Sequence, residues 1–383
     1  MSTPATDSTL SASSVPPTPL PSKPKKGFKY NPNKVAHVCD KLGLGYFSPI
    51  ARLIGRDEPA KQLKAIALNT FLPILAFAVF LIAWNSIAAI VVTESQKIPS
   101  PAETWAAWES MVEFAEIEKQ KEAEFLETIE TRATGLEERA LAKPERAEFY
   151  LEKAAEARSK EYLGNKTFFD QIYISVVTIA VGFLAASLIA IPIGILCGVS
   201  PLFNIAVNPL VQLFKPVSPL AWFPIVFVIT TWGIESPEPT SIWQRALFSS
   251  AGVVTLCSLW PTLINTAVGV ASVDKDHLNV AKVLKLNWMQ RIWKIVLPAS
   301  LPLIFTGLRV SIGVGWMVLI AADMMAQNQG LGKFVWDMYQ NGRIESFAQI
   351  TVAIFFIGGI GFLLDRIMLV MQRLVTFEEQ PGV

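Results

Sequence analysis

The sequence predicts an all-α polytopic membrane protein. Of its 383 residues, 52% are hydrophobic and only 17% carry a charge, whereas an average soluble domain carries about 25% charge. Much of that charge lies in two stretches, 1–64 and 109–166, so the remainder is apolar enough for several membrane spans. The composition therefore excludes an ordinary soluble enzyme, a disordered chain and a disulfide-rich scaffold.

Residues 1–64 are predicted to be a cytoplasmic N-terminal extension whose first part is disordered. Residues 1–26 are rich in Ser, Thr and Pro and cannot bury apolar surface. A cleaved signal peptide would place a short apolar core soon after its first basic residues, and this segment does not. Lys and Arg recur from Lys23 to Lys64, ahead of the first long apolar run. Because such positive flanks stay in the cytoplasm, the N-terminus is predicted to lie inside.

Six apolar segments are long enough to cross a membrane, which takes about 20 residues. They cover residues 66–92, 172–199, 203–231, 247–270, 302–325 and 347–371. The third is interpreted as one broken span, because several prolines interrupt it. With the N-terminus inside, the Lys- and Arg-rich loop 271–301 and the C-terminus also fall inside, in agreement with the positive-inside rule. The chain is therefore predicted to consist of five parts in order. They are an N-terminal extension (1–64), a first transmembrane helix (65–93), an extracytoplasmic loop (94–167), a membrane core that includes the loop 271–301 (168–376) and a C-terminal tail (377–383).

The charged stretch 109–166 is dense in Glu, Lys and Arg, with Ala and Leu between them. Glu118 and Glu122 stand at helical spacing, and Gly135 and Pro144 are the expected breaks. We therefore expect a charged helical extracytoplasmic insertion of two or three helices, for which a helical hairpin is one arrangement. It is interpreted either as a solvated spacer or as a docking surface for a soluble partner.

The loop 271–301 holds the stretch with most functional content. Leu278, Ala281 and Leu284 stand about one helical turn apart, so a short amphipathic helix is predicted there. Such a helix lies along the membrane surface or in a groove of another protein. The small Ala281 allows close backbone approach, and Pro298 begins the next span.

Residues 279–287, with the Ile-x-Leu-Pro that ends at Pro298, resemble the EAA loop of binding-protein-dependent, MetI-like ABC transporter permeases. In this resemblance Asn279, Val280 and Ala281 take the Glu-Ala-Ala positions, and Lys285 takes the usual Gly. Asn-Val-Ala-Lys-Val-Leu-Lys-Leu is similar to the variant of the nitrate branch. Segments similar to the same branch are 99–101, 216–224, 258–270, 302–309 and 335–337. The resemblance covers about residues 66–105 and 168–376, and it says nothing of the N-terminal extension or the charged insertion.

The resemblance implies a permease subunit of an ABC importer for a small inorganic anion, with nitrate or nitrite as the expected substrate. Bicarbonate, cyanate, taurine and other sulfonates are the alternatives. The implied partners are ABC ATPase subunits that bind ATP-Mg, an extracytoplasmic substrate-binding protein, a second permease copy and the lipid of the inner (plasma) membrane. In the family the ATPase docks on the EAA loop. The ATPase-coupling candidates carried over are Leu278, Asn279, Val280, Ala281, Leu284, Lys285 and Pro298.

The chain itself is expected to be no enzyme and to hold no cofactor or metal. A phosphate-binding loop requires Gly-x4-Gly-Lys-Ser/Thr, and neither 164–167 nor 330–333 has this spacing. His37 and His277 are its only histidines, which disfavours a His-based metal site. A net charge of +1 provides no general attraction for nucleic acid.

Two further sets of residues are candidates for packing and for the translocation path. The helix-packing candidates are Gly194, Gly198, Gly307, Ser311 and Gly315, whose four-residue spacing favours close approach of helices, as static packing or as moving gate contacts. The path candidates are Lys215, Pro216, Pro219, Trp222, Pro224, Arg309 and Asp323. Charge inside apolar spans tends to face a bundle interior or water.

The charged path candidates have different expected roles. Lys215 and Arg309 would either lower the barrier for an anion or anchor the cytoplasmic side. Asp323 would repel an anion, so it is expected to be a structural partner or an outer-gate element.

Two other classes of protein compete with this interpretation. A secondary transporter working without an ATPase would be expected to show inverted repeats or ionisable relays at mid-span, and neither is clear. A membrane scaffold would use the charged insertion to bind partners. An ATPase that co-purifies with the chain and responds to a binding protein would support the ABC permease alone.

Overall fold

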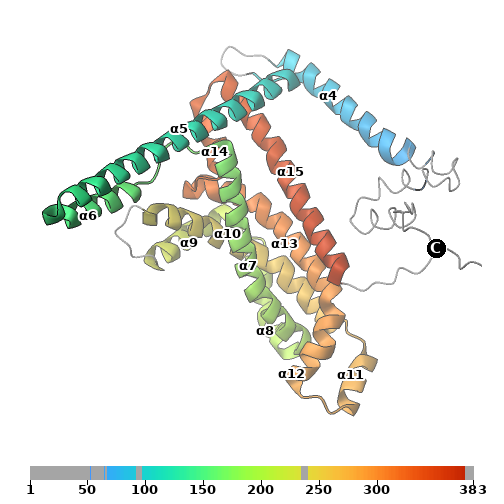
Figure 1. Cartoon of the computed structure of the whole chain (residues 1–383). Coiled ribbons are helices and arrows are strands. Elements are labelled where there is room, and N and C mark those ends of the chain that lie inside the picture. Colours follow the sequence, from blue (N-terminus) through green and yellow to red (C-terminus); the bar gives the residue numbers. More distant parts are fainter. Residues whose placement is uncertain (1–51, 53–63, 65–66, 92–96, 234–239, 376–383) are drawn as a thin grey trace, which may run out of the picture.

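The computed structural model describes residues 52, 64, 67–91, 97–233 and 240–375. Within these ranges every regular element is helical (Figure 1), which confirms the all-α prediction. The predicted tail 377–383 and almost all of the extension 1–64, with His37, lie outside the described residues.

Five helical segments of the described chain are long and apolar enough to cross a membrane. They include α4 (Leu72–Ile90), α7 (Phe168–Val199), α10 (Thr240–Ala271), α13 (Leu297–Ala326) and α15 (Ile344–Val375). A further passage consists of α8 (Pro201–Phe214) and α9 (Pro219–Gly233), which are bent by 107° at the break between them. The predicted pattern of about six spans is confirmed when this bent pair is counted as one.

The fifth predicted span begins earlier than the sequence indicated. Its helix runs without interruption from α12 (Trp288–Arg291) through a π-helical turn (Ile292–Val296) into α13. Pro298 lacks a backbone N–H, and its ring crowds the carbonyl four residues earlier, which favours the wider π geometry in the preceding turn. The predicted start at residue 302 is therefore wrong, because these prolines distort the helix without ending it.

Helix α10 lies between α7 and α13 and contacts both along its length. On the α7 side the two backbones meet at glycines. A Cβ added at Gly194 would lie 2.8 Å from the Leu263 carbonyl oxygen, and one at Gly198 would lie 2.7 Å from the Ala267 carbonyl oxygen. Real Cβ atoms essentially never approach so closely, so only glycine fits at these two positions.

The α13 side of α10 is packed equally closely. A Cβ added at Gly307 would lie 2.7 Å from the Cβ of Asn265, and one at Gly315 would lie 2.5 Å from the Ser258 hydroxyl oxygen. In lipid there is little hydrophobic force between helices, so such close contact is a main source of their association. The two faces of α10 therefore hold the centre of the bundle together.

Ser311 adds a hydrogen-bonded connection between α13 and α10. Its hydroxyl accepts a hydrogen bond from the Thr262 N–H (3.1 Å) and donates one to the Ser258 carbonyl (2.5 Å). In a regular α-helix these two backbone groups bond to each other. The Ser311 side chain is thus inserted into the backbone ladder of α10 beside Pro261, where the ladder already lacks a donor.

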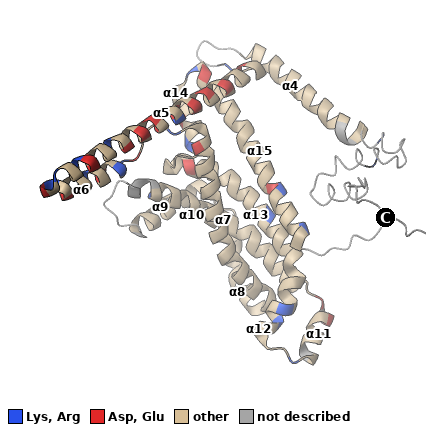
Figure 2. Cartoon of the chain, in the orientation of Figure 1, with Lys and Arg blue, Asp and Glu red and all other residues tan. Residues whose placement is uncertain are grey.

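The charged insertion forms a helical hairpin, in agreement with one of the predicted arrangements. Helix α5 (Pro101–Ala142) extends for ~63 Å across one end of the bundle, and α6 (Ala147–Arg158) packs back against it (Figure 1). Figure 2 shows charged residues of both signs closely spaced along these two helices, whereas the long apolar helices of the bundle carry few. Ser100 and Glu103 form a capping box at the start of α5.

Only one of the two predicted breaks in the insertion is correct. The chain turns at Pro144, as expected, but α5 continues through Gly135. A glycine inside a helix costs about 1 kcal/mol, which strong helix formers on both sides can offset. Arg158 also binds Glu130 and Glu137, one on each side of the glycine, and this fixes the local geometry.

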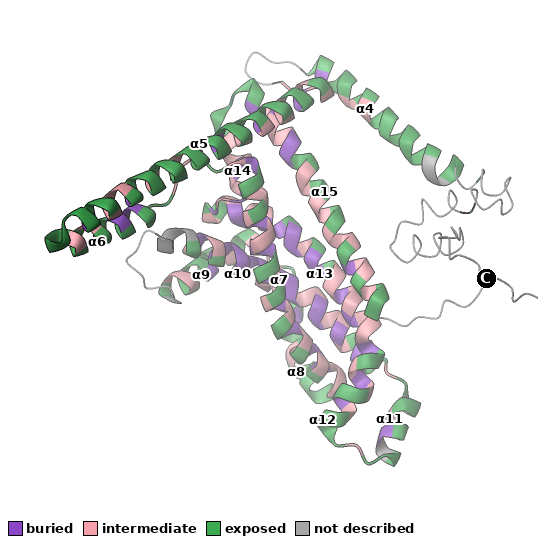
Figure 3. Ribbon diagram, viewed as in Figure 1, coloured by how far each residue is buried: buried purple, intermediate pink, exposed green. Residues whose placement is uncertain are grey.

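The two N-terminal helices differ in how far they join the bundle. The first turns of α5 are anchored by Trp108, whose ring stacks on Phe356 at 4.8 Å and meets Phe169 edge-on at 5.8 Å. By contrast, α4 buries only Ala88 among its residues, and most of its length is exposed (Figure 3). It contacts the bundle near its end, where the Trp84 ring lies 5.4 Å from that of Phe355. An apolar helix of 19 residues exposed in this way is suited to lipid contact.

Replacing Gly307 by Ala is expected to lower the free energy of unfolding by about 1–3 kcal/mol, because the new methyl group would overlap Asn265 of α10. The matched control is Gly313→Ala on the same helix, where a Cβ would meet nothing within 4 Å. The measurement is thermal unfolding of the purified protein in detergent. Equal transition temperatures for the two variants would contradict the close-packing argument.

Candidate coupling and translocation site

Helix α11 (Lys275–Val283) lies at the end of the bundle opposite the hairpin (Figure 1). At its start, the Asp274 carboxylate accepts a hydrogen bond from the Asp276 N–H (3.0 Å). At its end, the Leu286 N–H donates to the Ala281 carbonyl (3.0 Å), and Lys285 adopts a left-handed conformation with φ of 48°. This is a Schellman-type helix end, in which the left-handed position favours glycine.

The α11 helix has a buried face and an exposed apolar face. Ala281 is 1% exposed and Leu278 is half-buried. Leu278 and Ala281 thus share a face, as predicted, but Leu284 does not join them. The helix ends at Val283, and the turn that follows leaves Leu284 exposed. We define the α11–α12 apolar surface as the exposed side chains of Val280, Val283, Leu284, Trp288, Met289 and Trp293. Trp288, Met289 and Trp293 were not among the sequence-based candidates, although their position just before an apolar span is a signal for them.

The break between α8 and α9, with the first half of α9, contains most of the predicted path residues. Lys215 and Pro216 are exposed, Pro219 begins α9, and Pro224 lies inside it. The Trp222 ring packs on Phe214 with centroids 5.5 Å apart. The Trp222 indole nitrogen is buried and has no acceptor among the described residues. The break therefore carries an exposed lysine, and α9 carries a buried indole donor without an acceptor among the described residues.

Arg309 does not stand free in this structure. Its guanidinium binds the Asp365 carboxylate of α15 through two nitrogens, with Nη2 2.9 Å from Oδ2. Arg366 adds a second cation 3.3 Å from the same carboxylate. Sequence analysis missed Asp365, for which the only signal was an acid within an apolar span.

Asp323 is fully buried at the hairpin end of α13. Its carboxylate accepts hydrogen bonds from Ser175 of α7 (3.0 Å) and from the Asn328 amide (2.8 Å). Ser175 in turn accepts the Leu331 N–H (2.9 Å), at the start of α14 (Leu331–Asn341). Asp323 therefore connects α7, α13 and α14 through neutral donors. It lies about 21 Å along α13 from Arg309, so the structure does not bring these two path candidates together.

The fold and this arrangement define a multi-pass membrane protein with an exposed apolar surface at one end of a helical bundle and a few charged residues along it. Residues 190–376 match the family model described as binding-protein-dependent transport system inner membrane component. The chain belongs to this family of membrane permease subunits. Membership implies an ABC ATPase and a substrate-binding protein as partners, and the permease subunits of the family carry no ATPase site of their own.

Several permeases are similar to this chain. The nitrate import permease protein NrtB of Synechocystis sp. is 38% identical over 210 residues, which cover 55% of this chain and 70% of NrtB. The bicarbonate transport system permease protein CmpB of the same organism is 39% identical over 213 residues, covering 55% of this chain and 70% of CmpB. The taurine transport system permease protein TauC of Escherichia coli is 30% identical over 226 residues, which cover 59% of this chain and 76% of TauC.

Replacing Asp323 by Leu is expected to destabilise the protein by about 2–4 kcal/mol, because it leaves the buried Ser175 and Asn328 donors unpaired. Asp323→Asn keeps an acceptor for Asn328 and is expected to cost less. The measurements are thermal unfolding and proteolysis at the turn between α13 and α14. Equal protease sensitivity of wild type and Asp323→Leu would show that this network does not hold the turn.

Proposed function

We propose that this chain is the permease subunit of an ABC importer that moves a small inorganic anion, nitrate or nitrite, inward across the inner (plasma) membrane. The similarity to NrtB supports nitrate. The equally high identity to CmpB makes bicarbonate the first alternative, and TauC supports taurine or another sulfonate as the second. Cyanate and transport without an ATPase are further alternatives from the sequence.

The proposed orientation places both termini and α11 in the cytoplasm and the hairpin outside. The loop 271–301 is rich in Lys and Arg, which favours the cytoplasmic side. The opposite positions of α11 and α5 in the bundle are consistent with this assignment (Figure 1).

The α11–α12 apolar surface is the observation that carries the coupling proposal. Val283 is 81% exposed and Leu284 63% exposed, with Trp288 and Trp293 nearby in sequence and similarly uncovered. Exposed apolar patches of this kind mark protein–protein or membrane interaction sites. We assign the surface to the ATPase subunit, which would bind ATP-Mg. The permease chain would then need no catalytic group, cofactor or metal of its own.

The path proposal uses a second copy of the chain and the break between α8 and α9. Many side chains of these two helices are exposed and apolar, among them Leu213, Ile225 and Trp232, which supports a permease homodimer formed along this face. Lys215 and the Trp222 indole would offer an anion a charge and a donor. Arg309 would attract the anion less strongly, because its charge is offset by that of Asp365.

Leu284→Glu is expected to abolish ATP-driven uptake without reducing the amount of protein in the membrane, because a carboxylate replaces an exposed apolar contact of the ATPase. Ala281→Glu is expected to act likewise by unseating α11. The matched control is Asp276→Asn on the same helix. Uptake and immunoblotting of membranes measure the two effects. Normal uptake by Leu284→Glu at normal abundance would remove the docking assignment.

The substrate is tested in proteoliposomes that hold the permease together with its ABC ATPase and substrate-binding protein. Nitrate is expected to stimulate ATP hydrolysis and to enter the vesicles only with ATP. Bicarbonate and taurine serve as the comparison substrates. If bicarbonate alone stimulates ATP hydrolysis, bicarbonate replaces nitrate as the proposed substrate. Uptake without ATP would favour a secondary transporter.

A further inference from the structure

The charged cluster between α13 and α15 has one cation more than its carboxylate can balance. Asp365 is bound by Arg309 through two nitrogens and is approached by Arg366 Nη2 at 3.3 Å. Two arginines and one aspartate leave one positive charge. Figure 2 shows this small charged group on two long apolar helices, apart from the charged hairpin. The proposed path gives a role to Arg309 but none to Arg366.

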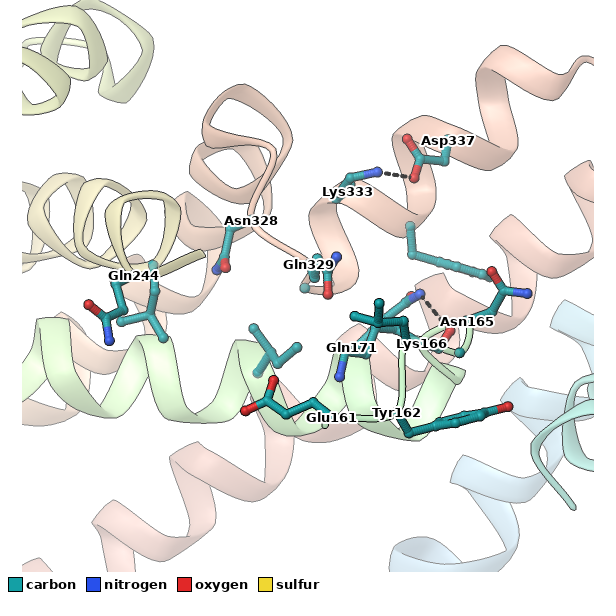
Figure 4. Close-up of a pocket in the computed structure, with 16 residues that line it drawn as sticks. Glu161, Tyr162, Asn165, Lys166, Gln171, Gln244, Asn328, Gln329, Lys333 and Asp337 are labelled. Atoms are coloured by element: carbon teal, nitrogen blue, oxygen red, sulfur yellow. Dashed lines mark hydrogen bonds and ion pairs between the residues drawn. The ribbon is translucent and has the colours of Figure 1, made fainter. Parts of the chain in front are cut away.

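The polar pocket at the hairpin end of the bundle has no such excess. This pocket, of about 710 Å³, is lined by Lys166 and Lys333, but Glu161 and Asp337 line it as well (Figure 4). Lys333 is paired with Asp337 at 2.5 Å. Each lysine there is matched by a carboxylate, so the excess charge at Arg366 is the stronger sign of a missing anionic partner.

The protein satisfies the Arg366 guanidinium only in part. This group carries five N–H donors. Among the described residues its polar contact is the one with Asp365, and its buried Nε atom has no acceptor. Its central carbon also lies 5.0 Å from the centroid of the Phe362 ring. The side chain is 34% exposed, so its outer donors remain accessible to a ligand from outside the bundle.

The surface around Arg366 is apolar. Phe362, Leu363 and Ile367 of α15 are each more than half exposed, and Val310 of α13 is 48% exposed. These side chains offer a small hydrated anion no hydrogen bonds, whereas hydrocarbon chains would cover them favourably. An apolar face beside an incompletely paired guanidinium therefore fits a ligand that has long hydrocarbon chains and an anionic head.

The depth of Arg366 suits a lipid headgroup. Helix α15 has 32 residues and is about 48 Å long, whereas the hydrocarbon core of a membrane is about 30 Å thick. With α15 centred in this core, Arg366 lies about 5 Å inside the boundary on the side of Val375. An arginine side chain is long enough to bring its charge to the headgroups from there. The exposed Arg373 adds positive charge nearer the end of the helix.

We propose that Arg366, at the edge of the Arg309–Asp365 pair, binds the phosphate of an anionic phospholipid whose acyl chains lie along α13 and α15. The excess positive charge favours a headgroup with a net negative charge over a zwitterionic one, which brings its own cation. In the orientation proposed above α15 ends in the cytoplasm, so the lipid belongs to the inner leaflet. The site is independent of the anion that is transported.

The test is a lipid titration of the full-length permease in detergent, followed by native mass spectrometry. The ligands are phosphatidylglycerol, phosphatidylcholine with the same acyl chains, and inorganic phosphate. Wild type is expected to bind phosphatidylglycerol at least about five-fold more tightly than phosphatidylcholine, as expected for one nearby charge. Arg366→Gln is expected to remove this preference, and Arg366→Lys to keep most of it.

Lys153→Gln is the matched control, since it removes one positive charge from an ion pair on α6. Thermal unfolding in phosphatidylcholine shows whether Arg366→Gln is folded, as expected because the Arg309–Asp365 pair remains. Comparison of the three ligands on wild type tests the site without any variant.

Loss of the preference in Arg366→Gln, with the control unchanged, would support the lipid site. An equal preference in Arg366→Gln and wild type would overturn it, as would no preference in wild type. A dimer that retains no lipid would show that a second copy covers this face instead. Inorganic phosphate that binds as tightly as phosphatidylglycerol would also overturn the proposal, because the acyl chains would then contribute nothing.

Discussion

The close packing of α10 between α7 and α13 is the constraint on which the rest of the structure depends. Lipid supplies no hydrophobic force between apolar helices, so backbone contact must hold them together. Glycines on both flanking helices leave room for side chains and carbonyls of α10 that a methyl group would displace. Ser311 then joins two backbones by entering the ladder of α10. This fixed centre sets the register at which all other side chains meet.

Polar contacts at two levels of the bundle follow from that register. Near the hairpin, Asp323 can meet Ser175 only because α7 and α13 are held on either side of α10. Further along α13, Arg309 meets Asp365 of α15, which is 56 residues away in the sequence. A charge inside a membrane is costly unless it is paired or hydrogen-bonded. Each buried or half-buried charge therefore also restrains the helices that carry its partners.

The sequence predicted the spans well, because hydropathy and length alone identify them. It predicted α11 from its spacing and the hairpin from composition. The predictions failed where a helix continues through a residue that usually ends it. Helix α5 continues through Gly135, and a π turn carries the helix into Pro298. The partners Asp365 and Asn328 could not be found, since they depend on helix register. The coupling and path residues remain predictions.

The two ends of the protein are connected through α13. At one end, α11 contacts the π turn that continues into α13, so a force on α11 acts on the base of a continuous helix. At the other end, Asp323 attaches α13 to Asn328 of the following turn and, through Ser175 of α7, to the start of α14. Beyond Pro302, α13 is a regular helix whose turns are joined by hydrogen bonds, so a displacement at its base is carried along its axis. A partner that prefers one position of α11 would therefore also favour one arrangement of the turn between α13 and α14, because a ligand shifts a conformational equilibrium towards the state that it prefers.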